Sequence, residues 1–195
     1  MRRGFKEEAK RLALEIRGEI GLDAYAPLDP LLLANEYGID VYPFSELGQH
    51  GCSDAALAYF ADDEVATFSA ALIPIGTGMV ILDNDNHAAT RRRSSIAHEM
   101  AHVLLEHRFT TAILGPDGCR AVDKETEEEA EWFSGELLIT YTSALLLARR
   151  DASDAEVAQR YGVSPRRAAM RMNASGARTV ISRQRTARRK QSRPQ

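Results

Sequence analysis

The pentapeptide His98-Glu99-Met100-Ala101-His102 constrains the fold of this chain more than any other feature, because it fits the pattern HExxH. Apolar residues recur around it at helical spacing, so a helix is predicted from Ala88 to about Glu106. That apolar side carries Ile96, Met100, Val103 and Leu104. Residues four apart on a helix lie one above the other. Both imidazoles can therefore reach one metal ion, with Glu99 pointing into the same site.

A third metal ligand must come from another segment, because a catalytic zinc ion takes three protein ligands and leaves a fourth position to water. The acidic run 127–129 opens a second predicted helix, from Glu125 to about Ile139. Helical angles place Glu128 away from the apolar face, whereas Glu127 and Glu129 both border it, and geometry alone does not choose between them. Acidic residues at the start of a helix also complement the helix dipole. This is the expected role of the residues in the run 127–129 that bind no metal ion.

Two ordinary histidines on a helix are the alternative interpretation, since a short motif also arises by chance. The apolar neighbours argue against it. They bury the pair of imidazoles, and buried imidazoles need polar partners. A metal ion would provide one.

Composition and length indicate one soluble globular domain of ordinary size. The chain has 195 residues, of which 44% are hydrophobic and 27% charged. No segment approaches the ~20 apolar residues that span a bilayer, and a charged amphipathic helix opens the chain where a signal peptide would be apolar. The two cysteines, Cys52 and Cys119, lie far apart in the sequence, so a disulfide framework is not expected. These features favour a cytoplasmic protein without a membrane partner.

Helices are predicted on both sides of a short run of strands, which indicates an α+β fold with a small antiparallel or mixed sheet. The predicted strands are Ile39–Phe44, Ala55–Phe60, Val65–Ile73 and Met79–Leu82. The other predicted helices are Phe5–Ile20, Leu31–Tyr37, Asp154–Tyr161 and Pro165–Ala174.

Charge divides the chain into an acidic and a basic part. The first 156 residues hold 14 basic and all 28 acidic residues, a net −14, and the remaining 39 hold eleven basic residues and no acidic one, a net +11. Residues 154–171 have the rhythm of a helix-turn-helix, with Gly162 at the turn and Arg166, Arg167 and Arg171 expected to be exposed on the second helix. Those arginines either neutralise nucleic-acid phosphates or face water on a helical pair that completes the core.

Several blocks of the sequence resemble the ImmA/IrrE family of zinc metallo-endopeptidases. The blocks are residues 29–41, Phe68-Ser69-Ala70, Asn84-Asp85, Arg91–His98 and Glu129–Leu138. The resemblance implies a zincin-like metallopeptidase over residues 1–150. The pattern and composition of the remaining residues predict a helix-turn-helix-like segment over 151–177 and a basic, disordered tail over 178–195. The resemblance also implies that the glutamate directly before alanine, Glu129, is the third zinc ligand. Thr140 departs from the family, where many relatives have proline.

The resemblance further implies a mechanism and a partner. Zn²⁺ on His98, His102 and Glu129 would activate a water molecule, and Glu99 would act as the catalytic base. Tyr59, Tyr141 and His107 are candidates for stabilising the oxyanion only because they can donate hydrogen bonds. The implied substrate is a helix-turn-helix repressor of the Xre type, whose cleavage switches on a stress, prophage or mobile-element response.

Two alternatives stay open. The protein could instead be a DNA-binding or antitoxin-partner regulator with a structural or degenerate metal site and nucleic-acid contacts through its basic C-terminus. A peptide deformylase also combines HExxH with an upstream cysteine ligand, and Gly51-Cys52-Ser53 loosely resembles its cysteine motif. The other motifs of that enzyme are absent from the sequence, so Cys52 is expected to be an ordinary loop thiol.

Overall fold

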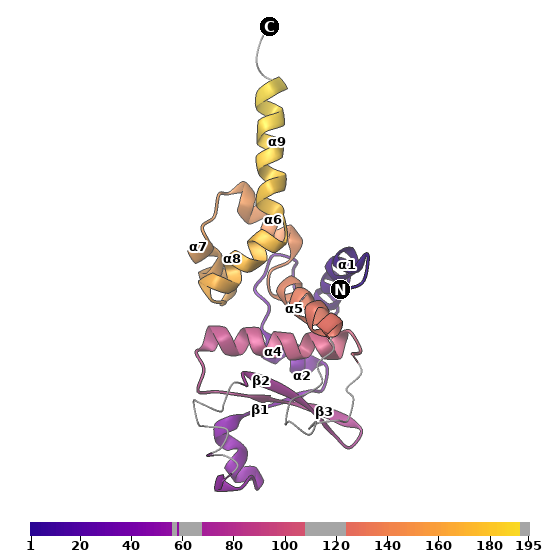
Figure 1. Cartoon of the computed structure of the whole chain (residues 1–195), viewed down its shortest axis with the longest axis vertical. Helices are drawn as coiled ribbons and strands as arrows, with labels where there is room; N and C mark the ends of the chain where they lie inside the picture. Colours follow the sequence, from indigo (N-terminus) through magenta and orange to yellow (C-terminus); the bar gives the residue numbers. More distant parts are fainter. Residues whose placement is uncertain (56–57, 59–67, 108–123, 192–195) are drawn as a thin grey trace. The chain divides into compact units, whose positions relative to one another are not determined.

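The computed structural model describes residues 1–55, 58, 68–107 and 124–191 (Figure 1). The chain divides into two compact units. Unit 1 comprises Met1–Arg3 and Asp29–Ser134, and unit 2 comprises Gly4–Leu28 and Gly135–Gln195. This division differs from the predicted segments 1–150, 151–177 and 178–195, because the first helix of the chain belongs with the C-terminal helices.

A three-stranded mixed sheet is the centre of unit 1. Its strands β1 (Asp40–Pro43), β2 (Ala70–Ile75) and β3 (Gly78–Asp83) lie in the order β1-β3-β2, with β1 parallel and β2 antiparallel to β3. Helices α2 (Pro30–Glu36), η1 (Phe44–His50), α4 (Ala89–Leu104) and the start of α5 (Lys124–Leu138) complete the unit. Helices around a small mixed sheet agree with the predicted α+β fold.

Local sequence explains these elements. The Asp29 side chain accepts the Leu31 N–H at 3.2 Å, with Pro30 at the first helical position, so α2 begins where capping chemistry predicts. Gly76, with a φ of 59°, turns the chain between β2 and β3. Helix α4 packs against both of these strands (Figure 1), and the cross-strand partners Leu72 and Ile81 are buried.

The strand predictions were partly correct. Strands β1 and β3 lie where they were predicted, and β2 begins later and ends two residues beyond the predicted Val65–Ile73. Residues 65–67 and most of the strand predicted over Ala55–Phe60 lie outside the described residues. The described parts of that second segment, Ala55 and Ala58, are helical and not extended.

Unit 2 consists of helices. Helix α1 (Phe5–Glu19) and the end of α5 belong to it, together with α6 (Tyr141–Arg149), α7 (Asp154–Tyr161), α8 (Pro165–Ala174) and α9 (Ala177–Gln191). Helices α7 and α8 pack on each other as predicted, with α7 begun by a Ser153–Glu156 capping box and α8 by the Ser164 hydroxyl. Their buried residues include Ala158, Tyr161, Val163, Ala168 and Met172.

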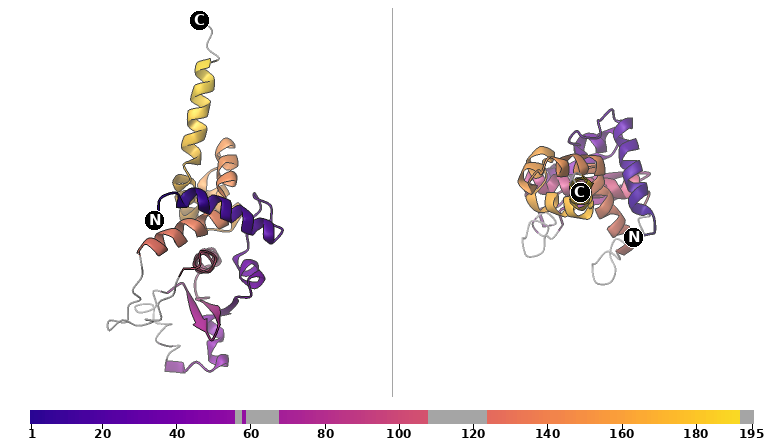
Figure 2. Two further views of the ribbon diagram at one scale, coloured as in Figure 1. Left: turned by 90° about the vertical axis from the view of Figure 1, so that its right-hand side faces the viewer. Right: turned by 90° about the horizontal axis from the view of Figure 1, so that it is seen from above.

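The segment expected to be a disordered tail is helical as far as Gln191, and residues 192–195 lie outside the described residues. Helix α9 packs against α6 and α8 through its first half, where Ala177 and Ile181 are buried, and its second half extends beyond them (Figures 1 and 2).

Arg171 is buried, which corrects the expectation that it is exposed on α8. Its Nε donates to the Ile139 carbonyl at 2.8 Å, and its guanidinium pairs with the buried carboxylate of Glu136. Arg17 of α1 is also buried and donates to the Leu137 carbonyl at 2.6 Å. Two guanidiniums therefore satisfy carbonyls at the C-terminal end of α5, which intrahelical bonds leave free.

Among the described residues, no helix combines the length and the apolar character needed to cross a membrane.

Candidate metal centre

The two histidines of the HExxH motif lie one turn apart in the C-terminal half of α4. Their Nε2 atoms are 3.2 Å from each other, and the ring planes meet nearly edge to face, with centroids 4.9 Å apart. His102 is buried, and His98 is half-buried. Both Nε2 atoms face the same point beside the helix, as the spacing of four residues predicts.

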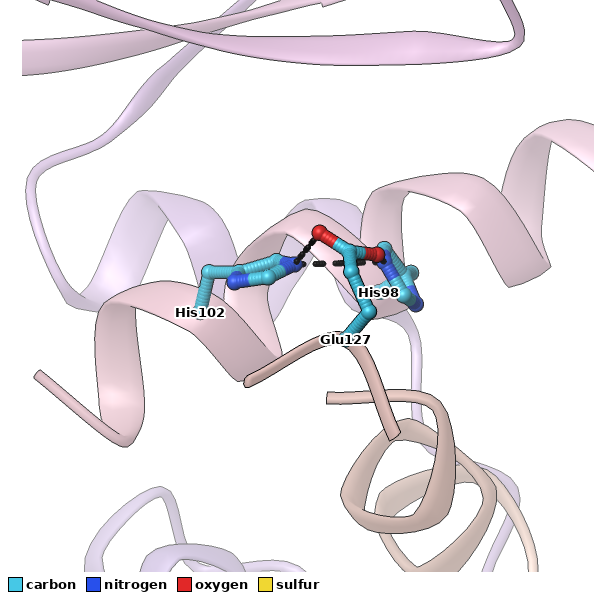
Figure 3. Close-up of side chains that lie close together, drawn as sticks. All are labelled: His98, His102 and Glu127. Carbon is cyan, nitrogen blue, oxygen red and sulfur yellow. Dashed lines mark hydrogen bonds and ion pairs between the residues drawn. The ribbon is translucent and has the colours of Figure 1, made fainter. Parts of the chain in front are cut away.

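Glu127, from the first turn of α5, brings a carboxylate to these imidazoles (Figure 3). Its Oε2 lies 3.1 Å from the Nε2 of His98, and its Oε1 lies 3.3 Å from the Nε2 of His102. The potential ligand atoms of these three residues all lie within 4.8 Å of one another, and no other such group of His, Cys, Asp or Glu occurs in the described part of the chain. Helical geometry had left Glu127 and Glu129 open, and the structure brings Glu127 to the histidines.

Glu129, which the resemblance indicates as the third ligand, points elsewhere in this structure. Its Oε1 accepts the main-chain N–H of Arg2 at 3.0 Å, and its Oε2 lies 3.9 Å from the Nε2 of His107. The side chain is nevertheless buried. Its role as a metal ligand stays a prediction. Glu128 lies on the exposed side of the helix, as the helical angles predict.

Acidic groups surround His98 and favour a cation there. Burial lowers the pKa of His98, but hydrogen bonds to Glu127 and Glu131 outweigh burial and raise the pKa to about 9. The Glu131 carboxylate lies 3.7 Å from the Nδ1 of His98. These acids therefore stabilise a positive charge, either a proton or a metal ion, between the imidazoles and Glu127.

Glu99 is buried, and the backbone of an edge strand holds it. Its Oε2 accepts the N–H of Leu72 in β2 at 3.1 Å. This hydrogen bond fixes the orientation of the carboxylate. A carboxylate held in this way next to the histidine pair has the chemistry of a general base.

Of the three proposed oxyanion donors, the structure places His107 at the histidine pair. Its Nδ1 lies 2.9 Å from the Nδ1 of His102, and burial lowers its pKa. Tyr141 belongs to unit 2, where the Lys10 ammonium lies 4.0 Å from its ring centroid, and Tyr59 lies outside the described residues. Cys52 is a free thiol outside the group of His98, His102 and Glu127, so the deformylase-like alternative gains no support.

The donor set fits zinc. Two imidazole nitrogens and one carboxylate are the protein ligands of many catalytic zinc sites, and a buried pair of imidazoles facing a carboxylate is the arrangement that such a site requires. The acids near His98 add negative charge that stabilises a divalent cation.

Comparison with known families agrees with this geometry. Residues 54–173, more than half of the chain, match the model of the IrrE N-terminal-like domain, the peptidase family M78. No curated protein and no solved structure matches the chain. The matched range contains His98, Glu99, His102 and both candidate glutamates. The chain therefore belongs to the IrrE N-terminal-like family of peptidases.

Proposed function

We propose that this protein is a zinc-dependent endopeptidase of the cytoplasm. The observation that carries the proposal is the convergence of His98, His102 and Glu127 from two helices, with ligand atoms within 4.8 Å of one another. Zinc bound there would lower the pKa of a water molecule and polarise a peptide carbonyl. Glu99 would accept the proton of that water and deliver it to the leaving amine.

Replacing Glu99 with glutamine tests the enzymatic part of the proposal. Glutamine keeps the shape of the side chain and removes its basicity. The E99Q variant should therefore bind zinc as the wild type does and cleave its substrate at least ~100-fold more slowly. Zinc is measured by elemental analysis and cleavage by gel electrophoresis. Full activity of E99Q would remove Glu99 from the mechanism.

The third ligand is proposed to be a carboxylate at the start of α5, either Glu127 or Glu129. Glu127 is supported by its contacts with both imidazoles, and Glu129 by the resemblance to the family. Comparing E127Q with E129Q decides between them, because the variant that lacks the true ligand should lose most of its zinc. E125Q is the matched control, since Glu125 stands on the same turn and its carboxylate pairs with the N-terminal ammonium of Met1 at 3.4 Å. Equal zinc retention in both test variants would contradict a carboxylate ligand.

We further propose that the substrate is a helix-turn-helix repressor of the Xre type, cleaved to start a stress, prophage or mobile-element response. The family resemblance of the sequence supports this proposal. Incubating the zinc-loaded protein with a repressor encoded beside it, and separately with E99Q, tests it. Fragments should form with the wild type alone. An intact repressor in both reactions would contradict the substrate proposal.

A second candidate function, nucleic-acid binding, is supported by helix α9. Arg178 and Arg185 pair with Asp154 and Asp151, whereas Arg183, Arg188 and Lys190 are exposed farther along the helix. Arginine forks suit phosphate groups, and α9 lacks the exposed apolar face that insertion into a lipid surface requires. Arg171 is buried, so of the three arginines expected to be exposed on α8 at least this one is unavailable, whereas Arg166 is exposed there.

Fluorescence anisotropy with a labelled DNA duplex at several salt concentrations tests this second function. The R183Q/R188Q variant should bind more weakly, and the slope of log affinity against log salt should fall by about two if both arginines contact phosphates. K6Q/R11Q on α1 is the charge-matched control and should change neither quantity. Identical slopes for all three proteins would contradict a phosphate-binding role of α9.

A further inference from the structure

His107 lies against His102 because of the way in which α4 ends. The helix stops at Leu104, and Glu106 has a φ of 52°, in the left-handed region. The N–H of Glu106 donates to the Val103 carbonyl and that of His107 to the His102 carbonyl, both at 3.0 Å. This pair of bonds is a Schellman motif, which reverses the chain after a helix. The reversal brings the ring of His107 to His102, with centroids 5.0 Å apart.

The two rings meet through their Nδ1 atoms, 2.9 Å apart, so one of these nitrogens must donate a proton and the other must accept it. The Nε2 of His102 faces Glu127 and His98 and must be free of a proton to bind a metal ion. A neutral imidazole then carries its proton on Nδ1. His102 is therefore the donor and His107 the acceptor.

The contact made by the second ring nitrogen of His107, Nε2, agrees with this assignment. A neutral His107 that accepts through Nδ1 carries its own proton on Nε2. That Nε2 faces the Oε2 of Glu129 at 3.9 Å, and a carboxylate is the group that attracts an N–H there. His107 is also largely buried, with 9% of its side chain exposed, so water competes little for either nitrogen.

We propose that His107 is a positioning residue of the metal centre: it accepts the Nδ1–H of His102 and thereby holds the ring and tautomer that present Nε2 to zinc. The proposal rests on the proposed zinc function and adds a residue outside the HExxH motif to its site. Outer partners of this kind orient a ligand, and their loss typically weakens metal binding about 10–100-fold. His107 itself contributes no ligand atom, because neither of its nitrogens faces the point between His98, His102 and Glu127.

Zinc affinity of three variants, measured by competition with a chromophoric chelator at constant pH, tests the proposal. H107L removes the acceptor and should weaken zinc binding about 10–100-fold. H107N places a carbonyl oxygen close to the position of the imidazole Nδ1 and should restore affinity to within a few-fold of the wild type. H87L, which removes a histidine outside the group, should bind zinc as the wild type does.

Nitrogen NMR of the zinc-loaded wild type provides a readout that does not depend on the fold of a variant. We expect a protonated Nδ1 on His102 and an unprotonated Nδ1 on His107. A protonated Nδ1 on His107, or H107L with wild-type affinity, would overturn the inference while leaving the zinc site in place. A wild-type protein that binds no zinc would overturn the proposed function as well.

Discussion

At the scale of single residues, His98 is a histidine with a carboxylate beside each of its ring nitrogens. Carboxylates of Glu127 and Glu131 lie 3.1 and 3.7 Å from its two ring nitrogens. A histidine so placed holds a proton in the absence of metal, and the proton and zinc compete for the same nitrogen. The acids therefore stabilise the metal-free protein when His98 is charged.

The metal-free protein should lose stability as the pH rises from about 6.5 to about 9. The pKa of His98 is raised from 6.5 to about 9 on folding, so its contribution is fully present below 6.5 and is lost as the pH rises through 9. The loss should not exceed ~3 kcal/mol, at about 1.4 kcal/mol for each unit of pKa difference. Urea unfolding with a chelator present measures it, and H98N should remove this part of the pH dependence. If H98N lost as much stability over this pH range as the wild type, other groups would be responsible for the loss.

At the scale of elements, the end of α5 shows how unit 2 satisfies a buried helix terminus. Arg17 and Arg171 donate to the carbonyls of Leu137 and Ile139, and Glu136 balances the charge of Arg171. Removing one partner of such a pair leaves a buried charge, which costs more than the pair itself contributes. Gly135 makes room for this arrangement, since a Cβ there would lie 3.2 Å from the Cδ of Arg171.

Substituting valine for Gly135 should lower the free energy of unfolding by about 1–3 kcal/mol, because Arg171 is held by Ile139 and Glu136 and cannot move aside. Gly18 in α1 is the matched control. A Cβ there would meet nothing within 4 Å, so G18A should stabilise the helix by up to ~1 kcal/mol. Urea unfolding compares the two, and a neutral G135V would show that Arg171 has room to shift.

At the scale of the whole molecule, the proposed metal centre and the basic surface lie in different parts of the chain. The proposed metal centre lies in unit 1, and the basic helix α9 lies in unit 2. The first 156 residues, which include the proposed metal centre, carry a net charge of −14, and the remaining 39, which include α9, carry +11. A metal ion bound at the proposed site would join α4 to the start of α5, and should therefore stabilise the fold as well as supply the chemistry.

Removing zinc should lower the melting temperature. A ligand that binds only the folded state stabilises it by about 4 kcal/mol at a free concentration 1,000 times its dissociation constant. Thermal unfolding monitored by circular dichroism, with zinc and with a chelator, measures the difference. The variant H98A/H102A should unfold at the same temperature under both conditions. If it responded to zinc as the wild type does, the stabilising site would lie elsewhere.

The amino-acid sequence by itself determined the elements whose causes are local. The helix through His98 and His102 and the starts of α2 at Asp29-Pro30 and of α8 at Ser164 depend on periodicity and capping within a few residues. Each of these predictions agrees with the structure. The residues also indicated an acidic third ligand on the next helix, and the family resemblance added the expectation that this ligand is Glu129.

Only the tertiary structure decided which side chains meet across long stretches of sequence. Glu127 reaches the histidines because the start of α5 lies beside α4, and nothing in the pattern of either helix alone predicts that placement. Arg171 was expected to be exposed because a single helix does not show the buried carbonyl and carboxylate that receive its guanidinium. His107 could be seen five residues after the motif, but its contact with His102 depends on the left-handed turn at Glu106. Periodicity identifies the face of a helix, whereas the partner of that face is decided by how the chain folds back on it.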